Sequence, residues 1–305
     1  MLYPSFADLV ALKYKVSQLC YMSERAVSSV AAGGYYSPFR GQGLEFEEVR
    51  TYEPGDDIRA IDWRVTARTG RPHTKIFREE RERSVILCVD VNVSMRFGTK
   101  GTFKSIQAAR VAALLGWQAT INHDRLGACL FGDVPAGIHF FSPQRSSKPL
   151  LKMFKQLSQT NINDNAPYIP LEAALTHMNK AAPTGALVYI IGNFNLVNSA
   201  LEKQLSALRK RCDIILIPID DPIDKDIPAV GLLLFSPNNS ERFLVDTESQ
   251  EGREHYTTLW LKERESLHKI ASKLKIGMIP IGTEVDAGNV LFLGLKHTQV
   301  RRPKK

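Results

Sequence analysis

The stretch SVILCVDVNVSM, from Ser84 to Met95, decides the fold of this chain. Its apolar run VILCV gives Ser84 to Val89 the length and composition of a strand, and this strand ends at Asp90. An apolar run without alternation is typical of a strand buried on both faces, as in a parallel sheet. Polar Asn92 and Ser94 then alternate with apolar residues. We therefore predict a central strand whose carboxyl end leads into a polar loop.

Strand and helix patterns alternate beyond this stretch. Strands are expected at 84–89, 126–131, 138–141, 186–191, 212–219 and 276–281, and helices at 102–121, 146–159, 170–181, 199–210 and 252–275. Such alternation is typical of α/β proteins, and we predict a doubly wound, mostly parallel sheet. The short turn after 131 predicts a hairpin, which adds one antiparallel edge strand.

The chain is predicted to have three parts. Residues 1–83 form an N-terminal helix, from Phe6 to about Val30, and a strand elaboration packed on the main domain. Residues 84–285 form the main domain, with a hairpin insertion near 229–247. Residues 286–305 form a C-terminal segment with a basic tail. Five of the eight net positive charges lie in Lys296 to Lys305, so the rest is only mildly basic. We predict a solvated tail and no nucleic-acid-binding function; the alternative is an anionic partner of the tail, such as nucleic acid or lipid headgroups.

The composition is that of an ordinary globular chain. Hydrophobic residues make up 44% and charged residues 24% of its 305 residues. The longest apolar runs have strand length, well short of the ~20 residues that cross a bilayer, so no membrane span is predicted. The cysteines Cys20, Cys88, Cys129 and Cys212 form no CxxC pair and are interpreted as buried thiols. Because the N-terminus shows no export signal, we expect a cytoplasmic protein.

Three oxygen-bearing side chains follow the predicted central strand at every second residue: Asp90, Asn92 and Ser94. Ligands of open α/β sheets bind at the carboxyl ends of strands, so these groups can converge at that edge. Carboxylate, amide and hydroxyl oxygens suit a hard divalent cation. The pattern resembles the metal-ion-dependent adhesion site, DxSxS, of von Willebrand factor A domains. The predicted order of elements, with its antiparallel edge hairpin, also resembles that fold.

The chain departs from that adhesion site at three positions. Asn92 stands where its first serine belongs, and Asn193 stands where its aspartate belongs. Ile169-Pro170 stands where its threonine is expected, and Thr160 can substitute only if the loop folds back. Asp90 is then the one carboxylate of the site, which is too little negative charge to hold Mg²⁺. We predict a hydrogen-bonded loop without metal. The alternative is a degenerate Mg²⁺ site formed by Asp90, Asn92, Ser94 and Asn193.

A longer motif precedes the main domain. It reads RTYEPGDDIRAIDWR from Arg50 to Arg64, follows GQGLEF at 41–46, and is followed by Ala67-Arg68. Together with Asp90 to Ser94 it closely resembles the bacterial family catalogued as domain of unknown function 58. The hallmark of that family is G-x-EF, R-x-Y-x-x-GDD-x-R-x-IDW, a following A-R and a von Willebrand A sheet. The resemblance spans most of the chain and implies the fold predicted above.

The same motif places acids beside arginines. We predict a charge-paired network that fastens the N-terminal part onto the sheet, with Trp63 as its apolar anchor. The alternative is that the arginines and aspartates of the motif form a partner-facing surface. The residues concerned are Arg50, Tyr52, Asp56, Asp57, Arg59, Asp62, Trp63, Arg64 and Arg68.

The family resemblance implies a protein-interaction module without catalytic residues. Members are commonly encoded beside MoxR-type AAA+ ATPases and are thought to act with them as adaptor or chaperone-like components. We therefore expect such an ATPase and its client as partners, recognised at a rim formed by Asp90 to Ser94, Asp133 and Asn193. The rival hypothesis is an aspartate-dependent phosphatase, with Asp90 as nucleophile and Asp220-Asp221 as metal-binding acids. Asn92 cannot donate the proton that the general acid of such an enzyme supplies.

Overall fold

The computed structural model describes residues 3–16, 44–53, 56–79, 83–159, 167–235 and 243–300. Several residues considered above lie outside this part of the chain: Cys20, the predicted helix beyond residue 16, the motif residues 41–43, Pro54-Gly55, Thr160 and the tail residues 301–305. Contacts divide the chain into two compact units, a larger one made of Met1–Ala31 and Ser84–Lys305 and a smaller one made of Ala32–Arg83.

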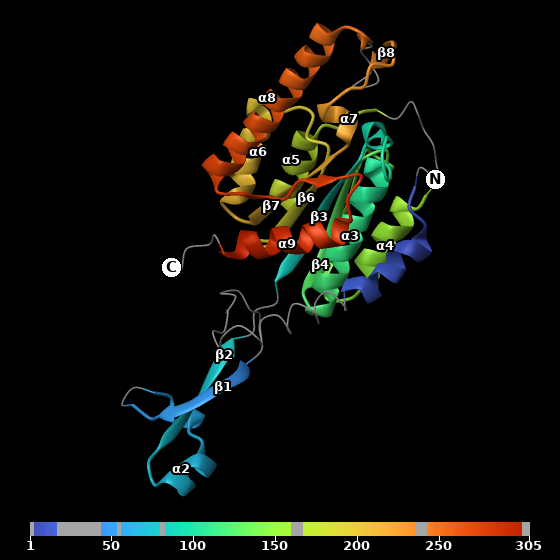
Figure 1. Cartoon of the computed structure of the whole chain (residues 1–305). Coiled ribbons are helices and arrows are strands. Elements are labelled where there is room, and N and C mark those ends of the chain that lie inside the picture. The colour runs from blue at the N-terminus through green and yellow to red at the C-terminus, as the bar shows by residue number, and fades with distance from the viewer. Residues whose placement is uncertain are drawn as a thin grey trace. The chain divides into compact units, whose positions relative to one another are not determined.

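The larger unit is built on a sheet with the apolar run VILCV at its centre (Figure 1). In spatial order its strands are β10 (Gly277–Met278), β7 (Asp213–Asp220), β6 (Leu187–Gly192), β3 (Ser84–Val91), β4 (Arg125–Gly132) and β5 (Ile138–Gln144), and β11 (Ile281–Gly282) also pairs with β7. All neighbours are parallel except β4 and β5, which are antiparallel. This confirms the predicted α/β class with a mostly parallel sheet and one antiparallel edge strand.

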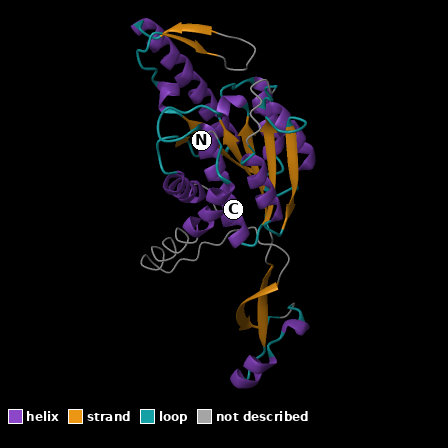
Figure 2. Ribbon diagram, turned by 90° about the vertical axis from the view of Figure 1, so that its right-hand side faces the viewer, coloured by secondary structure: helices purple, strands orange, loops and turns teal. Residues whose placement is uncertain are grey.

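Helices cover both faces of this sheet, because successive strand residues point to opposite sides. In β3, Val85, Leu87 and Val89 face one core, and Ile86 and Cys88 face the other. The first core is closed by the helical residues 6–16, α3 (Lys104–Ile121), α4 (Lys148–Leu157) and α9 (Ala287–Val300). The second core is closed by α5 (Leu171–Ala181), α6 (Ser199–Arg209) and α8 (Gln250–Leu274). Figures 1 and 2 show these two layers around the sheet, which is therefore doubly wound.

Two terminal helices belong to the first core. Residues 6–16 pack through the fully buried Leu9, whose carbonyl oxygen accepts a hydrogen bond of 3.0 Å from Trp117 Nε1 of α3. The second helix, α9, has no counterpart among the helices predicted from the sequence. Its Leu291 and Leu295 are buried. The C-terminal segment is therefore part of the core at least as far as Leu295.

A second hairpin precedes the longest helix. Strands β8 (Leu232–Phe235) and β9 (Phe243–Asp246) form an antiparallel pair that joins no other described strand. Ser249 then caps α8, and the buried residues of α8 begin only at Arg264. Figure 1 shows β8 and the amino-terminal part of α8 beyond the end of the sheet. This part of the larger unit is therefore mostly solvent-exposed surface.

The smaller unit is a two-stranded sheet with two short helical turns. Strand β1 (Leu44–Thr51) is antiparallel to β2 (His73–Glu79), and η1 (Ile58–Ala60) and α2 (Trp63–Thr69) lie in the connection between them. Gly70 ends α2 with φ of 70°, in the left-handed conformation that favours glycine. Across the described parts of both units, no helix combines the length and the hydropathy that crossing a bilayer requires.

Candidate functional site

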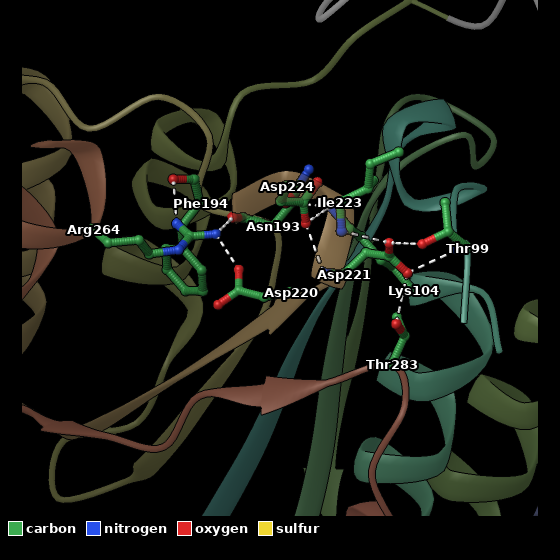
Figure 3. A network of polar contacts seen from close by, with 10 residues as sticks. All are labelled: Thr99, Lys104, Asn193, Phe194, Asp220, Asp221, Ile223, Asp224, Arg264 and Thr283. Atoms are coloured by element: carbon green, nitrogen blue, oxygen red, sulfur yellow. Dashed lines mark hydrogen bonds and ion pairs between the residues drawn. The ribbon is translucent and has the colours of Figure 1, made fainter. Parts of the chain in front are cut away.

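The carboxyl ends of β3, β6 and β7 lie side by side at one edge of the sheet, as parallel pairing requires. The residues that follow them are linked by hydrogen bonds and ion pairs, partly shown in Figure 3. We call this set the rim network. Its members are Asp90, Asn92, Lys104, Asn193, Asp220, Asp221, Asp224 and Arg264.

Asn92 closes the loop after β3 by bonding in two directions. Asp90 Oδ1 accepts hydrogen bonds from the backbone amide of Asn92 at 2.9 Å and from its Nδ2 at 2.8 Å. Asn92 Nδ2 also donates to the carbonyl oxygen of Ile169 at 3.0 Å, and Asn92 Oδ1 accepts from the amide of Ile169 at 2.9 Å. Ile169 lies where the adhesion-site threonine was expected. The segment before α5 is therefore tied to the β3 loop by an amide side chain.

The ammonium group of Lys104 is buried inside the rim network. Lys104 is the first residue of α3 and is only 2% exposed. Its Nζ lies 2.6 Å from Asp224 Oδ2 and 3.1 Å from Asn193 Oδ1 (Figure 3). Lysine is almost never fully buried unless it is paired. The protein itself therefore supplies a positive charge at this edge of the sheet.

Arg264 of α8 is a second buried cation of the rim network. Its Nη2 donates to the carbonyl oxygen of Asn193 at 2.8 Å and forms an ion pair with Asp220, and its Nη1 donates to the carbonyl oxygen of Phe194 at 3.2 Å (Figure 3). Phe194 has φ of 52°, a conformation that non-glycine residues seldom adopt. The planar guanidinium of Arg264 thus holds a strained turn after β6.

The acids that follow β7 also have structural partners. Asp221 Oδ2 accepts hydrogen bonds from the amide of Thr99 at 2.8 Å and from Thr283 Oγ1 at 2.7 Å. Asp221 and Asp224 form the capping box of α7 (Pro222–Lys225). Burial raises the pKa of Asp221, but the hydrogen bonds from Thr99 and Thr283 outweigh this effect and lower it overall. The phosphatase hypothesis assigned Asp221 to a metal, but the structure uses it to join three segments.

The carboxyl group of Asp90 has an unusual proton affinity. Asp90 is 8% exposed, and this burial raises its pKa from 3.8 to about 6. The hydrogen bonds from Asn92, the backbone amide of Asn193 and the charge of Lys104 all act in the opposite direction. Burial is the largest of these effects because water is a better solvent for a carboxylate than the protein interior.

Replacing Asp90 by asparagine is expected to remove a pH-dependent loss of stability. The pKa of Asp90 is about 6 in the folded state and 3.8 in the unfolded state. The protonated carboxyl group therefore contributes its full stability below pH 3.8, and this contribution is lost as the pH rises through 6. The difference corresponds to about 3 kcal/mol. Urea unfolding between about pH 4 and pH 8 should show this loss in the unmodified chain and in an Asp226→Asn control at an exposed position, but not in Asp90→Asn. Equal pH dependence of all three chains would contradict this assignment.

The structure brings together the residues predicted for a metal site but gives them other partners. Asn92 and Asn193 bind Ile169 and Lys104 as described above. Ser94 lines, with Asp90, a cavity of about 20 Å³, which is large enough for about one water. Among the described residues, no group of three or more His, Cys, Asp or Glu side chains is placed to hold a metal ion. Sequence reasoning missed Lys104, because α3 also carries other polar residues such as Gln107 and Arg110 and nothing local marks this lysine as buried.

The predicted docking rim has little exposed surface. Asp90, Asn92 and Asn193 are 8%, 2% and 4% exposed. Asp133 forms an ion pair with Arg96, and both line a cavity of about 320 Å³ beside α4. These polar groups already bind groups of the same chain, and the expectation that a partner docks on them stays a prediction.

The motif aspartates of the smaller unit satisfy local backbone groups. Asp56 Oδ1 accepts a hydrogen bond of 2.7 Å from Arg50 Nη2. Asp57 caps η1 and Asp62 caps α2 through the amides that follow them. The predicted charge network is thus confined, among the described residues, to the pairs Arg50 with Glu53 and Asp56, and Asp62 with Lys75.

The remaining motif residues point mostly outward. Trp63 is 68% exposed, so the described residues of the smaller unit do not bury it, and its role as an anchor on the sheet stays a prediction. Asp62 caps α2, and Trp63 is the first residue of this helix, which buries none of its residues. Arg59, Arg64 and Arg68 are also exposed, and Tyr52 is half-buried.

Comparisons with known proteins place the chain among uncharacterised relatives. The family model described as "Protein of unknown function DUF58" matches residues 48–266. Uncharacterized proteins of Mycobacterium bovis and Mycobacterium tuberculosis are 28% identical over 209 residues, which cover 68% of this chain and 65% of theirs. The chain therefore spans less than two thirds of the length of these relatives.

Two solved structures are similar to parts of the chain. The conserved hypothetical protein BatB from Bacteroides thetaiotaomicron matches with a TM-score of 0.45 at 11% identity, over 71% of this chain and 98% of that protein. A von Willebrand factor type A protein from Catenulispora acidiphila matches with a TM-score of 0.41 at 10% identity, over 74% of this chain and 43% of that protein.

Proposed function

The chain belongs to the DUF58 family, and from this premise we propose that it is a non-enzymatic protein-interaction module that works with an AAA+ ATPase of the MoxR type. In this proposal the module binds the ATPase and presents a client protein to it, while the ATPase supplies the energy. We place the module in the cytoplasm. The three described cysteines are free and buried, which suits a reducing compartment.

One observation carries the interaction function: a leucine face on the second hairpin. Leu232, Leu234 and Leu244 are 64%, 59% and 65% exposed. Leu234 is the direct cross-strand partner of Leu244, and Leu232 lies two residues from Leu234, so all three side chains share one side of the β8–β9 ribbon. Burying a leucine side chain contributes about 1.5–3 kcal/mol. Exposed apolar patches are typical of protein–protein or membrane interaction sites, and we assign this one to a protein partner.

The rim network supports the non-enzymatic part of the proposal. The acids nearest to the strand ends are bonded to Asn92, Lys104, Arg264, Thr99 and Thr283. In this proposal these carboxylates act as structural partners, and none of them acts as a nucleophile or general base. In this proposal the rim network therefore stabilises the fold, and recognition takes place on the exposed hairpin.

Replacing the cross-strand leucine pair is expected to weaken ATPase binding. We expect the Leu234→Thr/Leu244→Thr double variant to bind the purified MoxR-type ATPase of the same bacterium at least ~10-fold more weakly than the unmodified chain, since two apolar contacts are lost. Threonine keeps the strand propensity of the hairpin. Leu293→Thr, at an α9 leucine that is 59% exposed, is the matched control and should bind normally.

Titration of the labelled chain with the ATPase, followed by fluorescence anisotropy, provides the measurement. Unchanged binding by the double variant would contradict the assignment of the leucine face. An unmodified chain that does not bind the ATPase at all, with or without nucleotide, would contradict the proposed partnership itself.

A further inference from the structure

We infer that α2 and η1 of the smaller unit form a docking surface for an acidic polypeptide segment. We call this surface the arginine face and define it by the exposed side chains of Ile58, Arg59, Trp63, Arg64, Arg68 and Arg71. The inference rests on the proposed interaction function and adds the chemistry of one partner. It concerns a different unit from the leucine face, so the two can be tested separately.

The aspartates of this segment do not neutralise its arginines. Asp57 Oδ1 accepts a hydrogen bond of 3.0 Å from the backbone amide of Arg59. Asp62 Oδ1 accepts from the amides of Arg64 and Val65 at 3.0 and 3.1 Å, and its other oxygen lies 3.7 Å from Lys75 Nζ. Both carboxylates therefore bind backbone amides, and Asp62 in addition faces Lys75.

The arginines of this segment have no acidic partner among the described residues. Residues 57–71 contain four arginines and two aspartates, and all four guanidinium groups belong to exposed residues. Arg64 and Arg68 are four residues apart, so they are neighbours on the surface of α2 without an acid between them. Two like charges at this spacing are unfavourable for an isolated helix. A carboxylate-bearing partner would turn this repulsion into bidentate ion pairs.

Apolar side chains accompany these charges. Trp63 is 68% exposed and Ile58 is 64% exposed. By helical spacing, Trp63 and Ala67 lie beside Arg64 and Arg68 on the same side of α2. Tryptophan and arginine are the residues that most often dominate protein–protein binding energy. An exposed aliphatic group such as Ile58 matches an apolar side chain of a polypeptide but neither a phosphate nor a base edge. The partner that fits is therefore an acidic segment with interspersed apolar residues, not a nucleic acid.

The test uses the full chain and a fluorescein-labelled peptide in which glutamates flank two leucines. The unmodified chain should bind this peptide, and binding should weaken as salt is added because exposed ion pairs are screened. Arg64→Glu/Arg68→Glu should weaken binding by about tenfold or more, and Arg64→Gln/Arg68→Gln should weaken it less. Trp63→Ala should weaken it with little change in the salt dependence. Both glutamate and glutamine favour helices, so α2 should remain folded.

The matched control reverses two lysines of the larger unit. Lys203→Glu/Lys210→Glu changes the net charge by the same amount at exposed positions and should leave peptide binding unchanged. Equal effects of the two double reversals would overturn the inference, because they would show only the effect of net charge. A single-stranded oligonucleotide is tested in the same way. If the chain binds it more tightly than the peptide, and the arginine variants lose this binding, the inference is overturned in favour of a nucleic-acid partner.

Failure of this inference is distinguishable from failure of the proposed function. If the arginine face is wrong, the Arg64→Glu/Arg68→Glu variant still binds the ATPase through the leucine face and the peptide shows no arginine-dependent binding. If the ATPase partnership is wrong, the unmodified chain does not bind the ATPase, whereas peptide binding keeps its dependence on Arg64 and Arg68.

Discussion

Replacing Lys104 by methionine is expected to lower the free energy of unfolding by about 3–5 kcal/mol. The side chain of Lys104 is 2% exposed and its ammonium group lies 2.6 Å from Asp224 Oδ2. Methionine fills a similar volume but leaves the carboxylate of Asp224 and the amide oxygen of Asn193 without the cation that satisfies them. Removing one partner of a buried ion pair is costly because the other charge stays buried.

Urea unfolding of the larger unit, followed by tryptophan fluorescence, measures this change. Lys203→Met on the exposed side of α6 is the control, and it should alter the free energy of unfolding by no more than about 0.5 kcal/mol. The double variant Lys104→Met/Asp224→Ala should lose less than the sum of the two single variants, because both partners of the pair are gone. A loss below about 1 kcal/mol for Lys104→Met would show that this cation does not hold the rim network.

Replacing Arg264 by leucine is expected to cost a similar amount, about 3–5 kcal/mol. Its guanidinium group satisfies the carbonyl oxygens of Asn193 and Phe194 and neutralises Asp220. Leucine supplies no donor, so two carbonyl groups and one carboxylate lose their partner at once. The strained turn at Phe194 then loses its support as well.

Two further variants separate the geometry of Arg264 from its charge. Arg264→Lys keeps the positive charge but cannot donate to three acceptors in one plane, so it should recover only part of the lost stability. Lys262→Leu, at an exposed position two residues earlier on α8, should have little effect. Full stability of Arg264→Lys would show that charge alone, without the planar fork, maintains the turn.

The sheet could be predicted from the sequence because its signals are local. The run VILCV and the later strands are short, apolar and separated by amphipathic helices, and this order admits few topologies. The helix α9 was missed because Gly288 and Gly294 lower its intrinsic helix propensity, and packing of Leu291 on the core decides its conformation.

The contents of the rim network could be predicted only in part. Asp90, Asn92 and Asn193 were found because parallel strand ends share an edge of the sheet. Lys104 and Arg264 were not found, because their partners are far away in sequence: Asp224 lies 120 residues after Lys104, and Asn193 lies 71 residues before Arg264. Pairings of this range depend on how the helices pack, which no local pattern specifies.

The motif of the smaller unit shows the reverse situation. Asp57 and Asp62 stand directly before the helical turns that they cap, and an aspartate in that position is a local signal that the sequence does carry. Interpreting these acids as ion-pair partners of the arginines overlooked the backbone amides that they bind. Once the acids are assigned as caps, the arginines and Trp63 are available for a partner.

The free energy of unfolding of the unmodified chain, measured in EDTA and then at rising Mg²⁺ concentrations, tests most directly whether Lys104 holds the rim network together without a bound metal ion. We predict the same value throughout, since the positive charge is covalently attached and independent of the buffer. A rise of about 1.4 kcal/mol for each tenfold increase in Mg²⁺, the signature of an ion bound only by the folded state, would contradict this account.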